Sequence, residues 1–135
     1  PGQSPQALNK IASGGELSRI SLAIQVITAQ TTHTPILVFD EVDVGIGGGV
    51  AKVVGELLRE LGQKTQIFCV THQAQVASQG HNHLYVSKST GGDSTQTSIV
   101  ELDEKEIIRE VARMLGGDDF TDESLAHAQQ MVAAR

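Results

Sequence analysis

Two acidic residues stand directly after a short apolar run in the first half of the chain. The run is Ile36-Leu37-Val38-Phe39, and Asp40-Glu41 follows it without a gap. An aspartate at the tip of a buried strand can hold Mg²⁺, directly or through water, and the next carboxylate can orient and deprotonate a water that attacks a γ-phosphate. This order of residue types is a Walker B pattern. The alternative is that two solvated acids merely end a buried strand.

A histidine follows a second apolar run. Ile67-Phe68-Cys69-Val70 leads into Thr71-His72, as the first run leads into Asp40-Glu41. We interpret His72 as a contact to the γ-phosphate or to the attacking water. The alternative is a hydrogen-bonded surface histidine, so the catalytic interpretation depends on His72 occurring in order with the other motifs.

The third motif begins a helix. Ser13-Gly14-Gly15-Glu16 stands before apolar residues at helical spacing. The simplest interpretation is a capping box, in which the Ser13 oxygen accepts a backbone N–H and Glu16 reaches back. Two glycines in a first helical turn cost about 1 kcal/mol each against alanine, which makes sense if a ligand must approach the backbone closely. Because bare N–H groups at a helix N-terminus attract anions, we interpret this segment as a phosphate site.

The spacing of apolar residues predicts the elements that position these motifs. A nearly all-buried helix runs from Ser13 to a stop at Thr34-Pro35, and the two apolar runs are strands buried on both faces. Between the strands, a glycine-rich turn at residues 45–49 leads into a helix at about residues 50–61. Strand, helix and strand at this spacing predict a βαβ unit with two parallel strands. The polar motifs then lie at strand C-termini, where open α/β sheets bind ligands.

The remainder of the chain is predicted to form a short helix, a hairpin and two longer helices. These elements lie at about residues 74–78, 84–86 paired with 97–102, 104–115 and 122–133. The hairpin turn is Thr90-Gly91-Gly92-Asp93, Gly116-Gly117 closes the first long helix, and Thr121 caps the second. The predicted fold class is α/β, with mainly parallel strands flanked by helices plus a β-hairpin.

Composition bounds the possible functions. The chain has 135 residues, 39% of them hydrophobic, and a formal net charge of -6, which is typical of one folded domain. Between Glu101 and Glu123 lie nine acids and three bases, so the whole imbalance falls in that block. The lack of a basic surface and the 3% aromatic content argue against a free-standing nucleic-acid-binding domain. One cysteine cannot form an internal disulfide, and no apolar run approaches the ~20 residues of a membrane span.

Two further polar features have simpler interpretations than a functional site. Cys69 lies inside a predicted buried strand, where a small inert apolar residue is expected. His81-Asn82-His83 offers half of a metal site, but it lacks an obvious third ligand. We therefore interpret it as the polar start of a strand.

The three motifs, in this order and with these gaps, resemble the ATP-binding-cassette ATPases and, within them, the SMC-like branch. Residues 12–16 are similar to the signature motif Leu-Ser-Gly-Gly-Gln, with Ala for Leu and Glu for Gln. Four blocks resemble the RecN family of bacterial repair proteins more closely: ASGGELSRISLA at 12–23, FDEVDVGIGG at 39–48, VTHQAQVA at 70–77 and REVARMLGG at 109–117. The last block is not expected in transporters or in chromosome-condensing SMC proteins.

The resemblance implies a P-loop NTPase fold of the ABC/SMC head type, of which this chain is the C-terminal lobe. Residues 1–12 are expected to be the loop by which the chain returns from a coiled coil, and residues 13–135 the lobe itself. No G-x-x-x-x-G-K-[ST] phosphate loop occurs in the sequence. The resemblance assigns that Walker A loop to an N-terminal half of the head, so we expect this chain alone to be inactive.

The mechanism implied by the family is dimeric. ATP bound by one head's Walker A loop is capped by Ser13-Gly14-Gly15-Glu16 of the other head, Asp40 organises Mg²⁺, Glu41 acts on the water and His72 steadies the γ-phosphate. The implied partners are the N-terminal head half, its coiled coil, a second copy of the head and, through the full-length protein, broken DNA. No membrane is implied, and the expected location is the cytoplasm, in association with the nucleoid.

Two alternatives from other classes are kept. A transporter's nucleotide-binding subunit would carry the same motifs, but that alternative does not explain why the RecN-like block at 109–117 is present. A non-catalytic interaction module would have no need for Glu41.

One departure from the wider class concerns the turn after the Walker B strand, which SMC-like heads usually end with an aspartate that reaches the partner subunit. Gly47 occupies that position here, so we assign it no side-chain role.

Overall fold

The computed structural model describes residues 14–31, 34–40, 43–91 and 94–135. The chain forms two compact units, Pro1–Thr71 and His72–Arg135. No described helix combines the length and apolarity that a bilayer span requires. The predicted α/β class is confirmed, because both units mix helices with strands.

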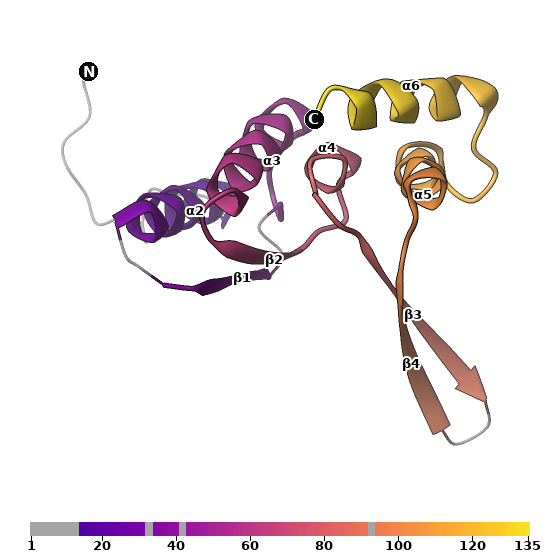
Figure 1. Ribbon diagram of the computed structural model, residues 1–135, viewed down its shortest axis with the longest axis horizontal. Helices are drawn as coiled ribbons and strands as arrows, with labels where there is room; N and C mark the ends of the chain where they lie inside the picture. The colour runs from indigo at the N-terminus through magenta and orange to yellow at the C-terminus, as the bar shows by residue number, and fades with distance from the viewer. Residues whose placement is uncertain (1–13, 32–33, 41–42, 92–93) are drawn as a thin grey trace. The chain divides into compact units, whose positions relative to one another are not determined.

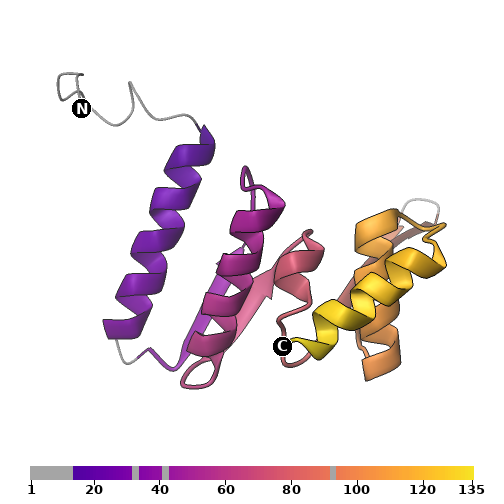
Figure 2. The same ribbon diagram turned by 90° about the horizontal axis from the view of Figure 1, so that it is seen from above.

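The first unit is a βαβ arrangement preceded by a long helix. Its elements are α2 (Gly14–Thr31), β1 (Ile36–Asp40), α3 (Gly48–Gly62) and β2 (Gln66–Val70). The strands pair in parallel, with Val38 opposite Phe68 and Asp40 opposite Val70. Figures 1 and 2 show α2 and α3 on the same side of this strand pair. The parallel crossover predicted from the sequence is confirmed.

The strand pair is covered on one face only, which corrects the prediction that both faces are buried. Phe39 is 3% exposed, whereas Val38 is 68% and Phe68 is 44% exposed. Because side chains alternate across a strand, Ile36 and Val70 share the exposed face with Val38 and Phe68. No described element of this unit covers that face, so within this unit the strands are less buried than the continuous apolar runs predict.

Helix α2 is buried along one stripe rather than all round. Leu22, Val26 and Ala29 are buried at helical spacing, while Ile24 is 59% and Ile27 62% exposed. The expectation of nearly complete burial is therefore wrong for the described side chains. The physical reason is that α3 packs against only one side of this helix.

Helix α3 carries the core of the first unit, because it packs against both α2 and β2. Its buried residues recur at the spacing of one helix face: Ala51, Val54, Gly55, Leu58 and Leu61. The predicted helix at residues 50–61 is confirmed, with two further residues at its start and one at its end. This helix fixes the crossover and thereby the placement of the two strand tips.

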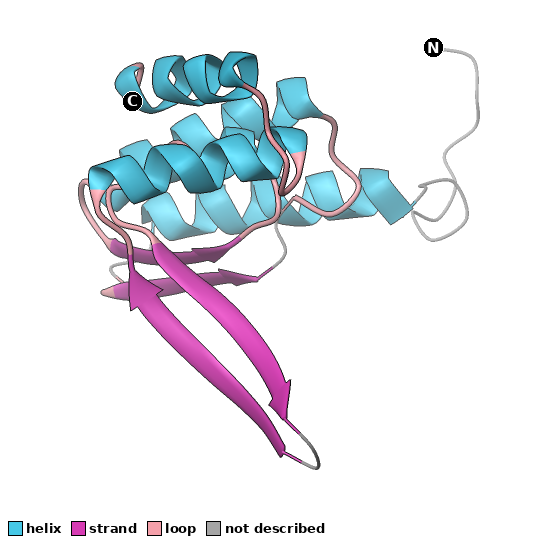
Figure 3. Ribbon diagram, turned by 90° about the vertical axis from the view of Figure 1, so that its right-hand side faces the viewer, coloured by secondary structure: helices cyan, strands magenta, loops and turns pink. Residues whose placement is uncertain are grey.

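The second unit joins a β-hairpin to three helices. Its elements are α4 (Ala74–Ala77), β3 (Leu84–Gly91), β4 (Ser94–Glu101), α5 (Glu104–Gly116) and α6 (Asp122–Ala133). The strands pair antiparallel from Leu84 opposite Glu101 to Gly91 opposite Ser94, and Figure 3 shows the hairpin as the long magenta pair. The predicted hairpin and helices are confirmed. The predicted turn at residues 90–93 is too long, because Thr90 and Gly91 belong to β3, and Gly92 and Asp93 lie outside the described residues.

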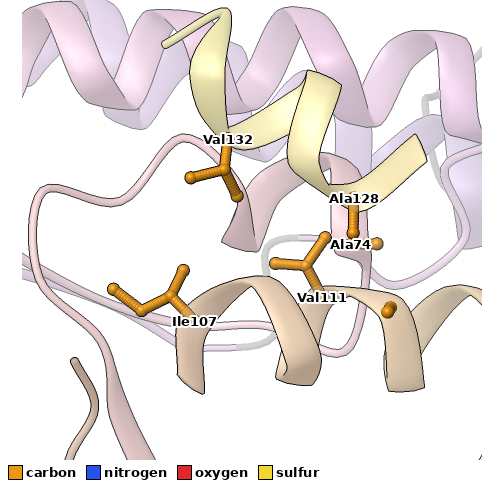
Figure 4. Packing of buried hydrophobic residues seen from close by; sticks show 6 residues of the cluster. Ala74, Ile107, Val111, Ala128 and Val132 are labelled. Carbon is orange, nitrogen blue, oxygen red and sulfur yellow. The ribbon is translucent and has the colours of Figure 1, made fainter. Parts of the chain in front are cut away.

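The core of the second unit lies where α5 packs against α6 and α4. Small and branched apolar residues fill it: Ala74, Ile107, Val111, Ala112, Ala128 and Val132 (Figure 4). Val111, Ala112 and Ala128 have no exposed surface. The short side chains let the helices approach closely, so the unit has a well-packed centre.

Local capping fixes the ends of these two helices. Glu106 N–H donates to the Asp103 carboxylate at 2.9 Å and Asp103 N–H donates to the Glu106 carboxylate at 2.8 Å, which is a complete capping box. Helix α5 ends at Gly117 with φ 81°, a backbone conformation that favours glycine. The predicted cap of α6 is confirmed, because Ser124 N–H donates to Thr121 Oγ1 at 3.3 Å.

Candidate functional site

Asp40 is the last residue of β1, at the edge of the sheet where both parallel strands end. Its register partner is Val70, so Thr71 is the next residue along β2 beyond that edge. The Asp40 side chain is exposed. Mg²⁺ keeps several waters and takes one or two carboxylates plus phosphate oxygens rather than a closed protein cage. An open carboxylate at a strand tip therefore fits the predicted magnesium role of Asp40.

Two of the predicted site residues, Ser13 and Glu41, lie outside the described residues, and their roles stay predictions. Gly14 and Gly15 are the first residues of α2, and Glu16 stands next to them in the first turn. The helix therefore begins at the glycine pair, where the first N–H groups have no intrahelical partner and can bind an anion. This backbone geometry fits the predicted phosphate contact.

His72 is the first residue of the second unit, and its side chain is exposed. It follows Thr71 directly, so the chain leaves the sheet edge through these two residues. An exposed imidazole is accessible to a ligand, as the predicted contact to a γ-phosphate requires. Exposure is equally expected of a surface histidine, so the catalytic role of His72 stays a prediction.

A buried carboxylate lies three residues after Asp40. Asp43 is 0% exposed, and its Oδ2 accepts a hydrogen bond from the Thr71 hydroxyl. The bond joins the turn that follows β1 to the residue that follows β2. It therefore links two segments that lie 28 positions apart in the sequence.

The charge of Asp43 also acts on Cys69. Burial first, and the negative charge of Asp43 second, raise the pKa of the Cys69 thiol to about 11. The thiol is therefore protonated near neutral pH and a poor nucleophile. This result agrees with the interpretation of Cys69 as an inert strand residue.

The turn between β1 and α3 is fixed by its backbone. Ile46 N–H donates to the Asp43 carbonyl oxygen at 3.3 Å, and the Ile46 side chain is buried. Gly45 has φ 76°, which a residue with a side chain rarely adopts. Gly47 caps α3 with φ -83°, and a Cβ at that position would meet nothing within 4 Å. Lack of space is therefore not the reason that this chain has glycine where other SMC-like heads are expected to have aspartate.

The His81-Asn82-His83 segment precedes β3, as predicted for the polar start of a strand. Asn82 Nδ2 donates to Glu101 Oε1 at 3.5 Å, which ties this start to the end of β4. Within the part of the chain that the structure describes, no group of three or more His, Cys, Asp or Glu side chains is placed to hold a metal ion. The segment is explained by its place in the hairpin.

Comparison with known proteins shows which proteins the chain is similar to. The chain is 56% identical to the DNA repair protein RecN of Vibrio cholerae over 134 residues and 53% identical to that of Haemophilus influenzae over 131 residues. The chain matches the C-terminal part of RecN. The two alignments cover 99% and 97% of this chain but 24% of each relative, so the chain spans about a quarter of the length of the curated relatives it matches. No protein-family model matches the chain.

Solved SMC structures share the fold. A structure of an SMC ATPase, concerned with ATP-driven dimerisation and DNA-stimulated activation, has a TM-score of 0.67 over 84% of this chain and 68% of its own, at 19% identity. The Smc head domain from Pyrococcus yayanosii, with its coiled coil and joint, has a TM-score of 0.65 over 76% of this chain and 19% of its own, at 22% identity. The predicted P-loop NTPase fold of the SMC head type is confirmed.

Asp43 and Thr71 have no role predicted from the sequence, although both lie inside blocks that resemble RecN. Asp43 stands two residues after Glu41, and Thr71 stands directly before His72. The sequence carries no local signal for this pair, because aspartate is a common turn residue and Asp43 stands before a glycine-rich turn. What the sequence does not show is that this acid is buried against the end of the second strand.

Proposed function

We propose that this chain is part of the ATPase head of a RecN-type DNA repair protein, in which ATP hydrolysis is coupled to the joining and release of two heads. The observation that carries the proposal is the parallel βαβ unit in a sequence 56% identical to RecN of Vibrio cholerae, with Asp40 at the tip of one strand and Thr71-His72 after the other. The SMC head fold supports it independently. None of the described features favours the alternative of a transporter subunit.

The chemistry follows from the residues at this edge of the sheet. Bound at Asp40, directly or through water, Mg²⁺ would neutralise charge on the phosphate oxygens of ATP. Glu41, the next residue, orients the attacking water and takes its proton. His72 contacts the γ-phosphate of the ATP molecule on which Asp40 and Glu41 act. The N–H groups at the start of α2 donate to the γ-phosphate of an ATP molecule held by a second head.

The proposal requires partners outside this chain. The Walker A loop is expected in an N-terminal half of the head, linked through a coiled coil, and the ATP then joins two such heads. The chain spans 24% of its relatives, which leaves ample length for these parts. Because the net charge of -6 is concentrated between Glu101 and Glu123, we place the DNA contacts elsewhere in the full-length protein. A protein that acts on chromosomal DNA is expected at the nucleoid, in the cytoplasm.

The substitution Glu41→Gln in the full-length protein tests the proposed chemistry. Glutamine keeps the size of the side chain but cannot take a proton, so ATP turnover should fall by about 10²-fold or more. ATP binding should persist, and the heads should accumulate as an ATP-bound dimer. Steady-state phosphate release and light scattering with and without ATP measure the two effects.

Glu60→Gln provides the matched control, because Glu60 is an exposed glutamate in α3. Its turnover should stay within about twofold of the parent protein, as expected for surface substitutions away from a site. Normal turnover in Glu41→Gln would remove Glu41 from the catalytic role and with it the proposed hydrolysis at this edge of the sheet.

A further inference from the structure

The hydrogen bond between Thr71 and Asp43 joins the two segments that leave the C-terminal edge of the sheet. Asp43 has no exposed surface, and Thr71 is half-buried. The hydroxyl donates to a carboxylate oxygen, Oδ2. Bonds of this kind to an ionised acceptor are stronger than those between neutral groups, and shielding from water strengthens them further. The contact therefore restrains both segments.

Each partner stands beside a residue of the proposed mechanism. Asp43 comes two residues after Glu41, and Thr71 comes directly before His72. A restraint between Asp43 and Thr71 consequently acts two residues after Glu41 and directly before His72. Neither Asp43 nor Thr71 is open to a ligand as Asp40 is, so their contribution is made through their neighbours.

We propose that Asp43 and Thr71 are positioning residues, whose hydrogen bond holds the turn that comes after Glu41 and the residue that comes before His72 in the geometry needed for hydrolysis. The inference rests on the proposed function. It adds a pair that acts without touching ATP, water or metal. In the proposed mechanism a misplacement of about 1 Å at the attacking water can cost about 10²-fold in rate, so a modest displacement of Glu41 is enough to be measured.

Cys69 provides a second readout of the Asp43 side chain. The Cys69 thiol lies on β2 two residues before Thr71, and the negative charge of Asp43 contributes to the raised pKa of that thiol. In the full-length protein, mass spectrometry of the peptide that contains Cys69 separates labelling at this cysteine from labelling elsewhere. Its labelling rate at a fixed pH provides a readout that is independent of turnover.

The decisive experiment substitutes Thr71 in the full-length protein. Thr71→Val keeps the shape of the side chain but removes the hydroxyl, and kcat for ATP should fall by about ten- to a hundredfold while KM stays within about twofold. Thr71→Ser restores the hydroxyl, so its kcat should return to within about threefold of the parent. Ser78→Ala is the matched control, because Ser78 is a 1% exposed residue whose hydroxyl donates to the Gln75 carbonyl oxygen at 3.3 Å. It should keep the parent kcat.

Three results would overturn the proposal: an unchanged kcat in Thr71→Val, a loss that Thr71→Ser does not restore, or an equal loss in Ser78→Ala. The double variant Asp43→Ala with Thr71→Val should be no slower than the slower single variant, because the two residues act through one bond. Additive losses would contradict a shared role. If Asp43→Ala does not fold, Asp43→Asn replaces it, and faster labelling of Cys69 in that variant confirms loss of the charge.

The Glu41→Gln result separates this inference from the function on which it rests. Loss of turnover in Glu41→Gln together with normal kcat in Thr71→Val would leave the proposed function standing and reject the positioning pair. Normal turnover in Glu41→Gln would reject the function itself.

Discussion

At the scale of single residues, His83 is a histidine whose burial makes protonation harder. It is mostly buried ahead of β3, and among the described residues its Nε2 has no hydrogen-bond partner. Burial lowers the pKa of His83 below 6.5, and the positive charge of Arg135 adds to this effect. The hydrogen bond to the Ala77 backbone and the charge of Glu110 act in the opposite direction but do not reverse it.

The lowered pKa predicts a loss of stability in mild acid. Since the unfolded chain binds a proton at His83 below about pH 6.5 and the folded chain resists it, the free energy of unfolding should decrease as the pH falls through that value towards the folded pKa. The variant His83→Gln should lose this part of the pH dependence. Urea unfolding between about pH 7 and about pH 5 measures how the free energy of unfolding changes with pH in the parent chain and in the variant.

His81→Gln is the natural control for that series, because His81 is exposed and two residues away. Its profile should follow the parent chain. A parent profile that is flat across this range, or a His83→Gln profile that keeps the full slope, would show that His83 is not the group responsible.

At the scale of elements, periodicity and stop signals predict where helices and strands lie, because these signals are local. The predicted helix at 50–61 becomes α3 (Gly48–Gly62), and the helix at 122–133 becomes α6 with Thr121 as its cap. Burial is predicted less well, because it depends on what covers a face. Val38 and Phe68 look like core residues in the sequence and are exposed in this unit.

In the candidate site, too, local motifs are predicted from the sequence but tertiary contacts are not. The sequence points to Asp40 and His72 because each follows an apolar run in a recognisable motif. It does not point to the Asp43–Thr71 hydrogen bond, since that pairing depends on the parallel register of β1 and β2 across 28 residues. Motifs report residues that meet a ligand, whereas the residues that hold them in place emerge only from the tertiary structure.

The start of α3 leads to a prediction about the element itself. Gly47 is the N-cap, makes no side-chain cap hydrogen bond, and has open space where a Cβ would stand. In Gly47→Asp the carboxylate can accept from the first-turn N–H groups and interact with the helix dipole, so the free energy of unfolding should rise by about 0.3–1 kcal/mol. Gly47→Ala lacks the acceptor and should give no such gain. Urea unfolding compares the free energies of unfolding of the two variants. Equal values would show that an N-cap acceptor at position 47 does not stabilise α3.

At the scale of the whole molecule, the exposed face of the β1–β2 pair requires a covering element. Ile36, Val38, Phe68 and Val70 form an apolar face that is open in this unit. Exposed apolar surface of this kind, on a chain that spans 24% of its relatives, is best explained by contact with another part of the same protein. We assign that contact to the N-terminal half of the head, which the proposed function already requires.

The assignment predicts how this chain behaves with and without that half. Alone, the chain should bind a hydrophobic dye such as ANS, and co-expression with the N-terminal half should abolish most of this binding. Because burying one such side chain contributes about 1.5–3 kcal/mol, Phe68→Ser should weaken association of the two halves by about tenfold or more. Val53→Ser is a suitable control, since Val53 is 53% exposed but belongs to α3 rather than to the open strand face. Isothermal titration of the two halves measures both variants, and equal affinities for Phe68→Ser and Val53→Ser would place the contact on another surface.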